Sequence, residues 1–109
     1  MNDEEYFKFN QTELYKIFGG AMALTFIGGQ VLSVHKNKRG GFTVQWKAHA
    51  SNGANRMTLT LNGGDLLDIE FGKFRAGKYT VIETIEDVYA EDFGRIWWDK
   101  TLLARSFKG

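Results

Sequence analysis

Strict alternation of apolar and polar residues marks residues 42–47, 57–61 and 67–71 of the chain. Successive side chains of a β-strand point to opposite faces of its sheet, so this alternation predicts three half-buried strands. Residues 31–36 and the β-rich residues 79–85 predict two more. Short turns separate most of these segments, and successive strands joined by short turns favour an antiparallel meander.

The segment before the first strand holds a helix signal and an ambiguous apolar run. Asn10 or Thr12 can cap a short helix that ends at Phe18, because two glycines follow it. The apolar residues 22–27 come next. They could continue as a helix, but the glycine pair at 19–20 favours a further strand.

The last element has helical periodicity. From Val88 to about Leu102 the apolar residues recur with the spacing of one helix face, and Asp87 is the expected N-cap. The predicted apolar stripe consists of Tyr89, Phe93, Ile96 and Trp97.

Together these elements predict one α+β domain over residues 1–109. We expect an antiparallel β-sheet of about five to six strands, with a short N-terminal helix and a C-terminal helix packed on one face. A chain of 109 residues suffices for one modest core. The predicted core consists of Val44, Trp46, Leu59, Leu61, Ile69, Phe71, Phe93 and Trp97.

The charge is distributed unevenly although the whole chain is only +1. Residues 14–64 contain six Lys or Arg and no acidic residue, whereas residues 65–99 contain nine acidic residues and four basic ones. Such polarity can steer a charged partner to one side of a small domain.

Several kinds of chemistry are excluded or disfavoured. The chain has no cysteine, so it has no disulfide, thiol nucleophile or thiolate metal site. His35 and His49 lack the spacing of metal ligands, and a zinc site needs three or four ligands. We expect no metal and no cofactor.

Asp68 and Glu70 project from one strand face and could act as an acid–base pair or hold a cation. The residues between and beside them, Leu67, Ile69 and Phe71, are expected to face the core. Asp68 and Glu70 are therefore better interpreted as part of a solvated polar face. The sequence shows no nucleophile–base set and no glycine-rich phosphate loop. We therefore expect no catalytic residue and no enzymatic activity.

The chain begins with an acidic segment rather than a signal peptide. Its longest apolar run, residues 21–27, is far too short to cross a membrane. We expect no membrane partner and a cytoplasmic location.

Two predicted turns are basic, one near residue 38 and one near residue 76. If they converge, they could contact the phosphates of a nucleic acid, although charged turns are usually only solvated. The predicted basic surface comprises Lys36, Lys38, Arg39, Lys47, Arg56, Lys73, Arg75 and Lys78.

Trp98 lies about 180° from Tyr89 on a helical wheel, on the face that carries Glu91 and Arg95. Burial of Trp98 beneath residues 102–107 is one interpretation. The other is that Glu91, Arg95 and Trp98 form a partner-binding face, because exposed tryptophan is typical of interface anchors.

Residues 59–75 (LTLNGGDLLDIEFGKFR) and 87–93 (DVYAEDF) carry a family resemblance. The pattern is similar to a group of small phage and mobile-element proteins, which also have a glycine pair like the one at 19–20. The resemblance covers about residues 14–103. Leu67 stands where the group has an aromatic residue.

The resemblance implies a phage or prophage setting, in which many small accessory proteins bind and inhibit host machinery, including CRISPR nucleases. We therefore expect stoichiometric, inhibitory binding of a host protein in the cytoplasm of a bacterial cell. The partner would be a CRISPR effector or another nucleic-acid-handling complex. The alternative function is that of an accessory protein that binds nucleic acid through the basic residues 36–56.

Overall fold

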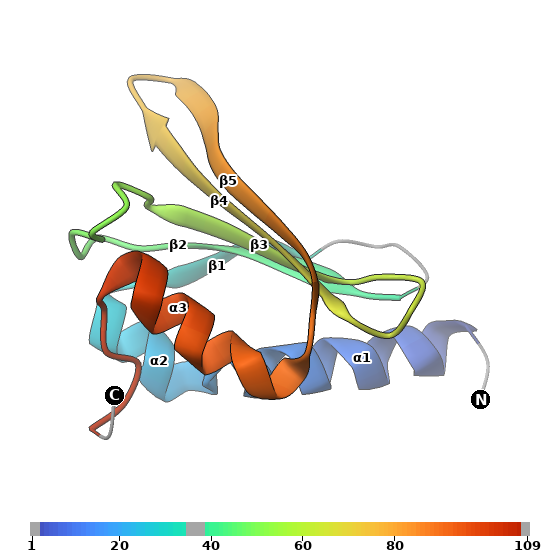
Figure 1. Ribbon diagram of the computed structural model, residues 1–109. Helices are drawn as coiled ribbons and strands as arrows, with labels where there is room; N and C mark the ends of the chain where they lie inside the picture. The colour runs from blue at the N-terminus through green and yellow to red at the C-terminus, as the bar shows by residue number, and fades with distance from the viewer. Residues whose placement is uncertain (1–2, 35–38, 108–109) are drawn as a thin grey trace.

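The computed structural model describes residues 3–34 and 39–107. Three helices lie on one face of a five-stranded sheet, which leaves the other face open (Figure 1). The helices are α1 (Asp3–Phe18), α2 (Gly20–Ile27) and α3 (Phe93–Thr101), and the short 3-10 helix η1 (Ala90–Asp92) precedes α3. The predicted α+β class is confirmed.

The sheet is an antiparallel meander, as the sequence predicted. Its strands follow chain order, β1-β2-β3-β4-β5, and each pairs antiparallel with the next. The strands are β1 (Gln30–Val34), β2 (Gly41–Gln45), β3 (Arg56–Leu61), β4 (Leu67–Arg75) and β5 (Lys78–Val88).

The core lies between the sheet and the helices and is centred on Trp97. The Trp97 ring packs edge-on against Trp46 and Phe18, with centroid distances of 5.1 and 5.6 Å. It also packs at a tilt against Phe71 and Phe93, at 6.2 and 6.3 Å. Seven of the eight predicted core residues are buried, and Leu61 is half-buried against them.

The prediction of a strand at residues 22–27 is wrong, because this segment forms α2. Ala23 and Ile27 are four residues apart and both buried, so the apolar run has helical spacing toward the core. Gly19 adopts a φ of 118°, which lets the chain turn sharply between α1 and α2. The sheet consequently has five strands, which is within the predicted five to six.

Helix α1 ends at Phe18 as predicted, but it begins at Asp3 rather than at Asn10 or Thr12. Asn10 is buried in the middle of the helix. The neighbouring Gln11 uses its side-chain amide to bond both backbone groups of Gly41, at 2.9 and 2.6 Å. These bonds hold α1 against the first residue of β2.

The C-terminal helix starts later than the sequence suggested. Strand β5 continues to Val88, and Asp87 is not a helix cap, since it sits within β5 at a φ of 58°. Tyr89 lies between β5 and η1 and is 58% exposed, so its assignment to the buried stripe is wrong. Phe93 and Trp97 are buried and Ile96 is half-buried, as predicted.

The C-terminal tail is held by Arg105. Its guanidinium donates to the carbonyls of Ile17 and Phe18 at the end of α1 and lies 5.2 Å from the centroid of the Phe93 ring. Burial of the guanidinium lowers the pKa of Arg105. The tail therefore joins α1 to α3 on the helix side of the molecule.

Candidate partner-binding surface

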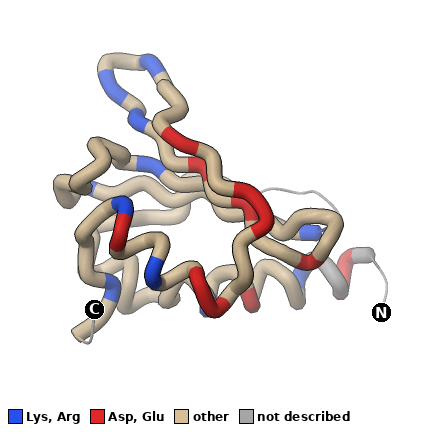
Figure 2. Tube along the Cα trace, in the orientation of Figure 1, with Lys and Arg blue, Asp and Glu red and all other residues tan. Residues whose placement is uncertain are grey.

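The hairpin of β4 and β5 projects away from the helix layer (Figure 1). Ala76 and Gly77 form its tip, and both have positive φ, as in the two-residue turns that suit twisted strands. Lys73, Arg75 and Lys78 surround this tip. Figure 2 shows the basic residues at the tip and the acidic ones nearer the helices, so the hairpin has two ends of opposite charge.

Aromatic side chains stiffen the open face of the hairpin. The Arg56 guanidinium lies 4.2 Å from the centroid of the Phe74 ring, and its Nε donates to Gln45 at 2.8 Å. Tyr79 donates its hydroxyl to Glu70 at 2.8 Å. A Cβ at Gly72 would lie 2.2 Å from the Tyr79 hydroxyl oxygen, so glycine is required for Tyr79 to lie across β4.

Asn55 ties the β2–β3 loop to the hairpin. Its side-chain amide donates to the carbonyl of Phe74 and accepts from the Phe74 N–H, each at 2.8 Å. Its own N–H donates to the carbonyl of Gly72 at 3.0 Å. Asn55 thus extends the pairing of β3 with β4 by one side chain and holds loop 46–55 at a fixed distance from the hairpin.

An open groove of about 580 Å³ lies between loop 46–55 and the hairpin. Lys47 and His49 line it from the loop, and Lys73 and Arg75 line it from β4. None of its lining residues is acidic. The groove is therefore a concave, positively charged surface, a shape that concentrates the potential of its charges.

The unpaired cations of the described residues lie at this groove and at the hairpin tip. Within the described ranges, the only lysine and arginine side chains without an ion pair, hydrogen bond or ring contact are Lys47, Lys73, Arg75 and Lys78. Three of these four line the groove, and the fourth stands at the hairpin tip. Their charges are available to a partner.

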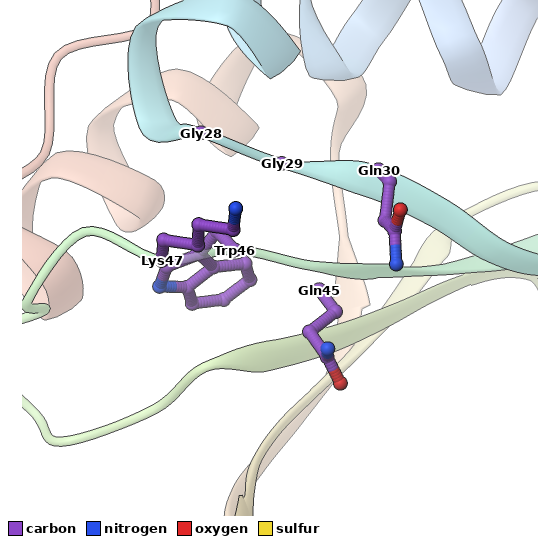
Figure 3. A pocket seen from close by; sticks show the side chains of 6 residues that line it. All are labelled: Gly28, Gly29, Gln30, Gln45, Trp46 and Lys47. Carbon is purple, nitrogen blue, oxygen red and sulfur yellow. The ribbon is translucent and has the colours of Figure 1, made fainter.

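Trp46 and Lys47 also line a second groove of about 440 Å³, together with the glycines that follow α2 and with Gln30 and Gln45 (Figure 3). Trp46 is 3% exposed, and its indole nitrogen has no hydrogen-bond partner. A buried donor without an acceptor costs about 1–3 kcal/mol. Figure 3 shows this nitrogen on the edge of the ring that points away from Gln30 and Gln45.

The predicted basic surface is thus brought together only in part. Lys47, Lys73, Arg75 and Lys78 converge at the groove and hairpin tip. Arg56 instead lies beneath Phe74 on the opposite face of the sheet and is occupied there. The remaining members stand apart: Arg39 is exposed but has a partner, and Lys36 and Lys38 lie outside the described residues, as does His35.

The face predicted around Trp98 is solvent-accessible. Trp98 is 48% exposed, whereas its neighbour Trp97 is 1% exposed. Glu91 is exposed, and Arg95 forms exposed ion pairs with Asp92 and Asp99, at 3.7 and 3.8 Å. Burial of Trp98 beneath the tail is ruled out, and its role in binding stays a prediction.

The paired carboxylates of β4 are occupied by the fold. Asp68 accepts hydrogen bonds from the side chain of Asn62 and the N–H of Asp87, at 3.0 and 3.1 Å, and Glu70 accepts from Tyr79. The part of the chain that the structure describes contains no group of three or more side chains able to hold a metal ion. None of its helices combines the length and apolar character that a membrane crossing requires.

Sequence reasoning missed Asn55 and Trp46 as parts of this surface. Trp46 was assigned to the core, which is correct for most of its ring. An asparagine directly before a strand gives no sequence signal that it will bond to a different strand.

The chain matches no protein-family model, no curated protein and no solved structure.

Tyr79 provides a spectroscopic probe of the hairpin. Desolvation, with the hydrogen bond and charge of Glu70 adding to it, raises the pKa of Tyr79 from 10.0 to about 12. Because the folded-state pKa is raised, its contribution to stability is fully present below about pH 10 and is lost as the pH rises through about 12. Titration of phenolate absorbance should show one late step that Tyr79→Phe removes.

Tyr89→Phe is the matched control for this titration, because Tyr89 is exposed and lies outside the hairpin. It should leave the late step in place. A Tyr79→Phe protein that still shows the late step would place the raised pKa elsewhere.

Proposed function

We propose that this protein is a non-enzymatic binding protein that engages another protein through the β4–β5 hairpin. The observation that carries the proposal is the projecting hairpin, which carries both exposed apolar side chains and unpaired cations. Val81 and Ile82 of β5 are 49% and 40% exposed, and Val81 pairs with Gly72, whose neighbour in β4 is Lys73. Apolar side chains rimmed by charge are typical of protein-binding surfaces.

The charge of the same hairpin disfavours the alternative, binding of a nucleic acid. Glu83, Glu86 and Asp87 lie farther along β5, so a long phosphate backbone laid along the hairpin would meet repulsion. Of the basic residues 36–56 expected to serve that function, Arg39 and Arg56 have partners in the fold. A protein surface with mixed charges fits the two-ended hairpin better.

The family resemblance supports the class of partner. In a phage setting, such a protein would bind a host protein stoichiometrically and inhibit it, with a CRISPR effector or another nucleic-acid-handling complex as the expected target. The host cell's cytoplasm is the place where this binding would occur.

The test is affinity capture from bacterial lysate with Val81→Glu, with and without nuclease. Wild-type protein should retain a stoichiometric partner after nuclease treatment, and Val81→Glu should lose at least about tenfold of the captured amount, because a charge would be buried at the interface. Met22→Glu is the matched control, since Met22 is 51% exposed on α2, away from the hairpin.

Capture that nuclease abolishes would favour the nucleic-acid alternative. Equal capture by Val81→Glu and wild type, with unchanged thermal melts, would remove the hairpin from the interface.

A further inference from the structure

We propose that the groove between loop 46–55 and the hairpin is a carboxylate-binding site that accepts a short acidic peptide segment. This inference rests on the protein-binding function proposed above and names the chemistry of its partner. It depends on three features of the groove, namely its charge, its rigidity and its surroundings, and Trp46 in its lining serves as the probe.

The charge of the groove is uncompensated. Lys47, Lys73 and Arg75 line it without an ion pair, and none of its lining residues is acidic. Apart from Lys78 at the hairpin tip, the other cations on the described surface are used by the fold, as with Lys100, which bonds Glu83 at 2.9 Å. A carboxylate placed between the loop and β4 would supply the missing counter-charge and form charge-assisted hydrogen bonds.

Both walls of the groove are fixed before any ligand binds. Asn55 bonds the two backbone groups of Phe74, which holds the loop to β4. The N–H of Ser51 donates to the carbonyl of Thr101 at 2.8 Å, which holds the same loop to the end of α3. Because the cations stand on pre-organised backbone, binding orders little of the chain.

Trp46 provides a probe of the groove. The residue lines the groove and is 97% buried, and its buried indole nitrogen has no hydrogen-bond partner. The nitrogen lies on the ring edge opposite Gln30 and Gln45 (Figure 3). Because Trp46 lines the groove, a carboxylate bound there would change the surroundings of its indole ring.

The surroundings favour a short acidic peptide over a polyanion. A groove of about 580 Å³ accommodates a few side chains, and the acidic residues of β5 begin beyond it at Glu83. A segment with a few glutamate or aspartate residues can end before that point, whereas a nucleic-acid strand would continue past it.

The experiment is an NMR titration of the full-length, nitrogen-15-labelled protein with a short polyglutamate peptide, at constant ionic strength. The indole N–H signal of Trp46 should shift saturably. The signal of Trp97 should stay in place, because its N–H already donates to the carbonyl of Leu103 at 2.8 Å. Polyglutamine should cause no shift.

The double variant Lys73→Ala, Arg75→Ala should lower the affinity for the polyglutamate peptide by about tenfold or more, since two charge-assisted contacts are lost. Lys8→Ala combined with Lys16→Ala is the matched control, because it removes the same charge from exposed positions of α1. It should change the affinity by less than about twofold.

Absence of a saturable shift at Trp46 would overturn the site. Tighter binding of a single-stranded oligonucleotide than of polyglutamate would overturn its assignment to carboxylates. The two proposals can fail separately: peptide binding without any captured partner contradicts the proposed function alone, and capture that depends on Val81 without peptide binding contradicts the groove alone.

Discussion

Phe93→Ala should destabilise the fold by about 3–5 kcal/mol, the range measured for truncation of large aromatic residues in cores. Phe93 is 1% exposed at the start of α3. Its ring packs at a tilt against Trp97 and Phe18, with centroid distances of 6.3 and 6.4 Å, and the Arg105 guanidinium lies over it. One truncation therefore loosens α3, α1 and the tail together. Denaturant unfolding followed by circular dichroism measures the change.

Tyr89→Ala is the matched control, four residues earlier on the stripe that the sequence predicted. Tyr89 is 58% exposed, so its truncation should cost no more than about 1 kcal/mol. If both variants lost the same large amount of unfolding free energy, Tyr89 would pack on the sheet in solution. A loss below about 1 kcal/mol for Phe93→Ala would mean that α3 is not docked on the sheet.

The strands were predictable because both faces of the sheet have distinct environments. One face meets the helices and the other meets solvent, so β2, β3 and the first part of β4 alternate, and a slip of one residue would bury the polar set. Burial of Met57, Leu59, Ile69 and Phe71 follows that alternation directly. The meander then follows from the short turns.

The sequence predicted α2 and the start of α3 less well, and the reasons are local. In α2, Ala23 and Ile27 bury a helical face, but the run around them is apolar apart from Thr25 and shows no clear period. At α3, Tyr89 has helical spacing to Phe93, yet β5 extends to Val88 and leaves Tyr89 in the connection. Tertiary packing decided both cases.

The candidate groove depends on side-chain pairing that residue spacing does not encode. Arg56 and Arg75 are both basic residues at strand ends, but Arg56 is covered by Phe74 and bonded to Gln45, whereas Arg75 is unpaired beside the groove. The sequence alone identifies the basic residues. The fold is needed to distinguish cations that stabilise the hairpin, such as Arg56, from unpaired ones, such as Arg75.

The two candidate binding surfaces of the chain, the groove and the face around Trp98, differ in the kind of binding energy they offer. The groove supplies long-range attraction, which speeds association and weakens with salt. Trp98 supplies apolar area that excludes water at short range, which sets the lifetime of a complex. A partner that used both would associate through the hairpin and be retained through α3.

Trp98→Ala should therefore weaken binding of the captured partner by about 2 kcal/mol or more, which is about thirtyfold in Kd. The free energy of unfolding should change by no more than about 1 kcal/mol, because Trp98 is 48% exposed and Trp97, not Trp98, occupies the core. The helix geometry is the reason, since consecutive residues lie about 100° apart and cannot share one face. A thermal melt and a binding titration on the same variant measure the two quantities.

Phe107→Ala is the matched control. Phe107 is 90% exposed, and truncation of an exposed aromatic side chain without a role in binding should change neither the melt nor the Kd. If the Trp98→Ala melt collapses, Trp98 stabilises the fold; if its Kd equals that of Phe107→Ala, the face around Glu91 and Arg95 does not contact the partner.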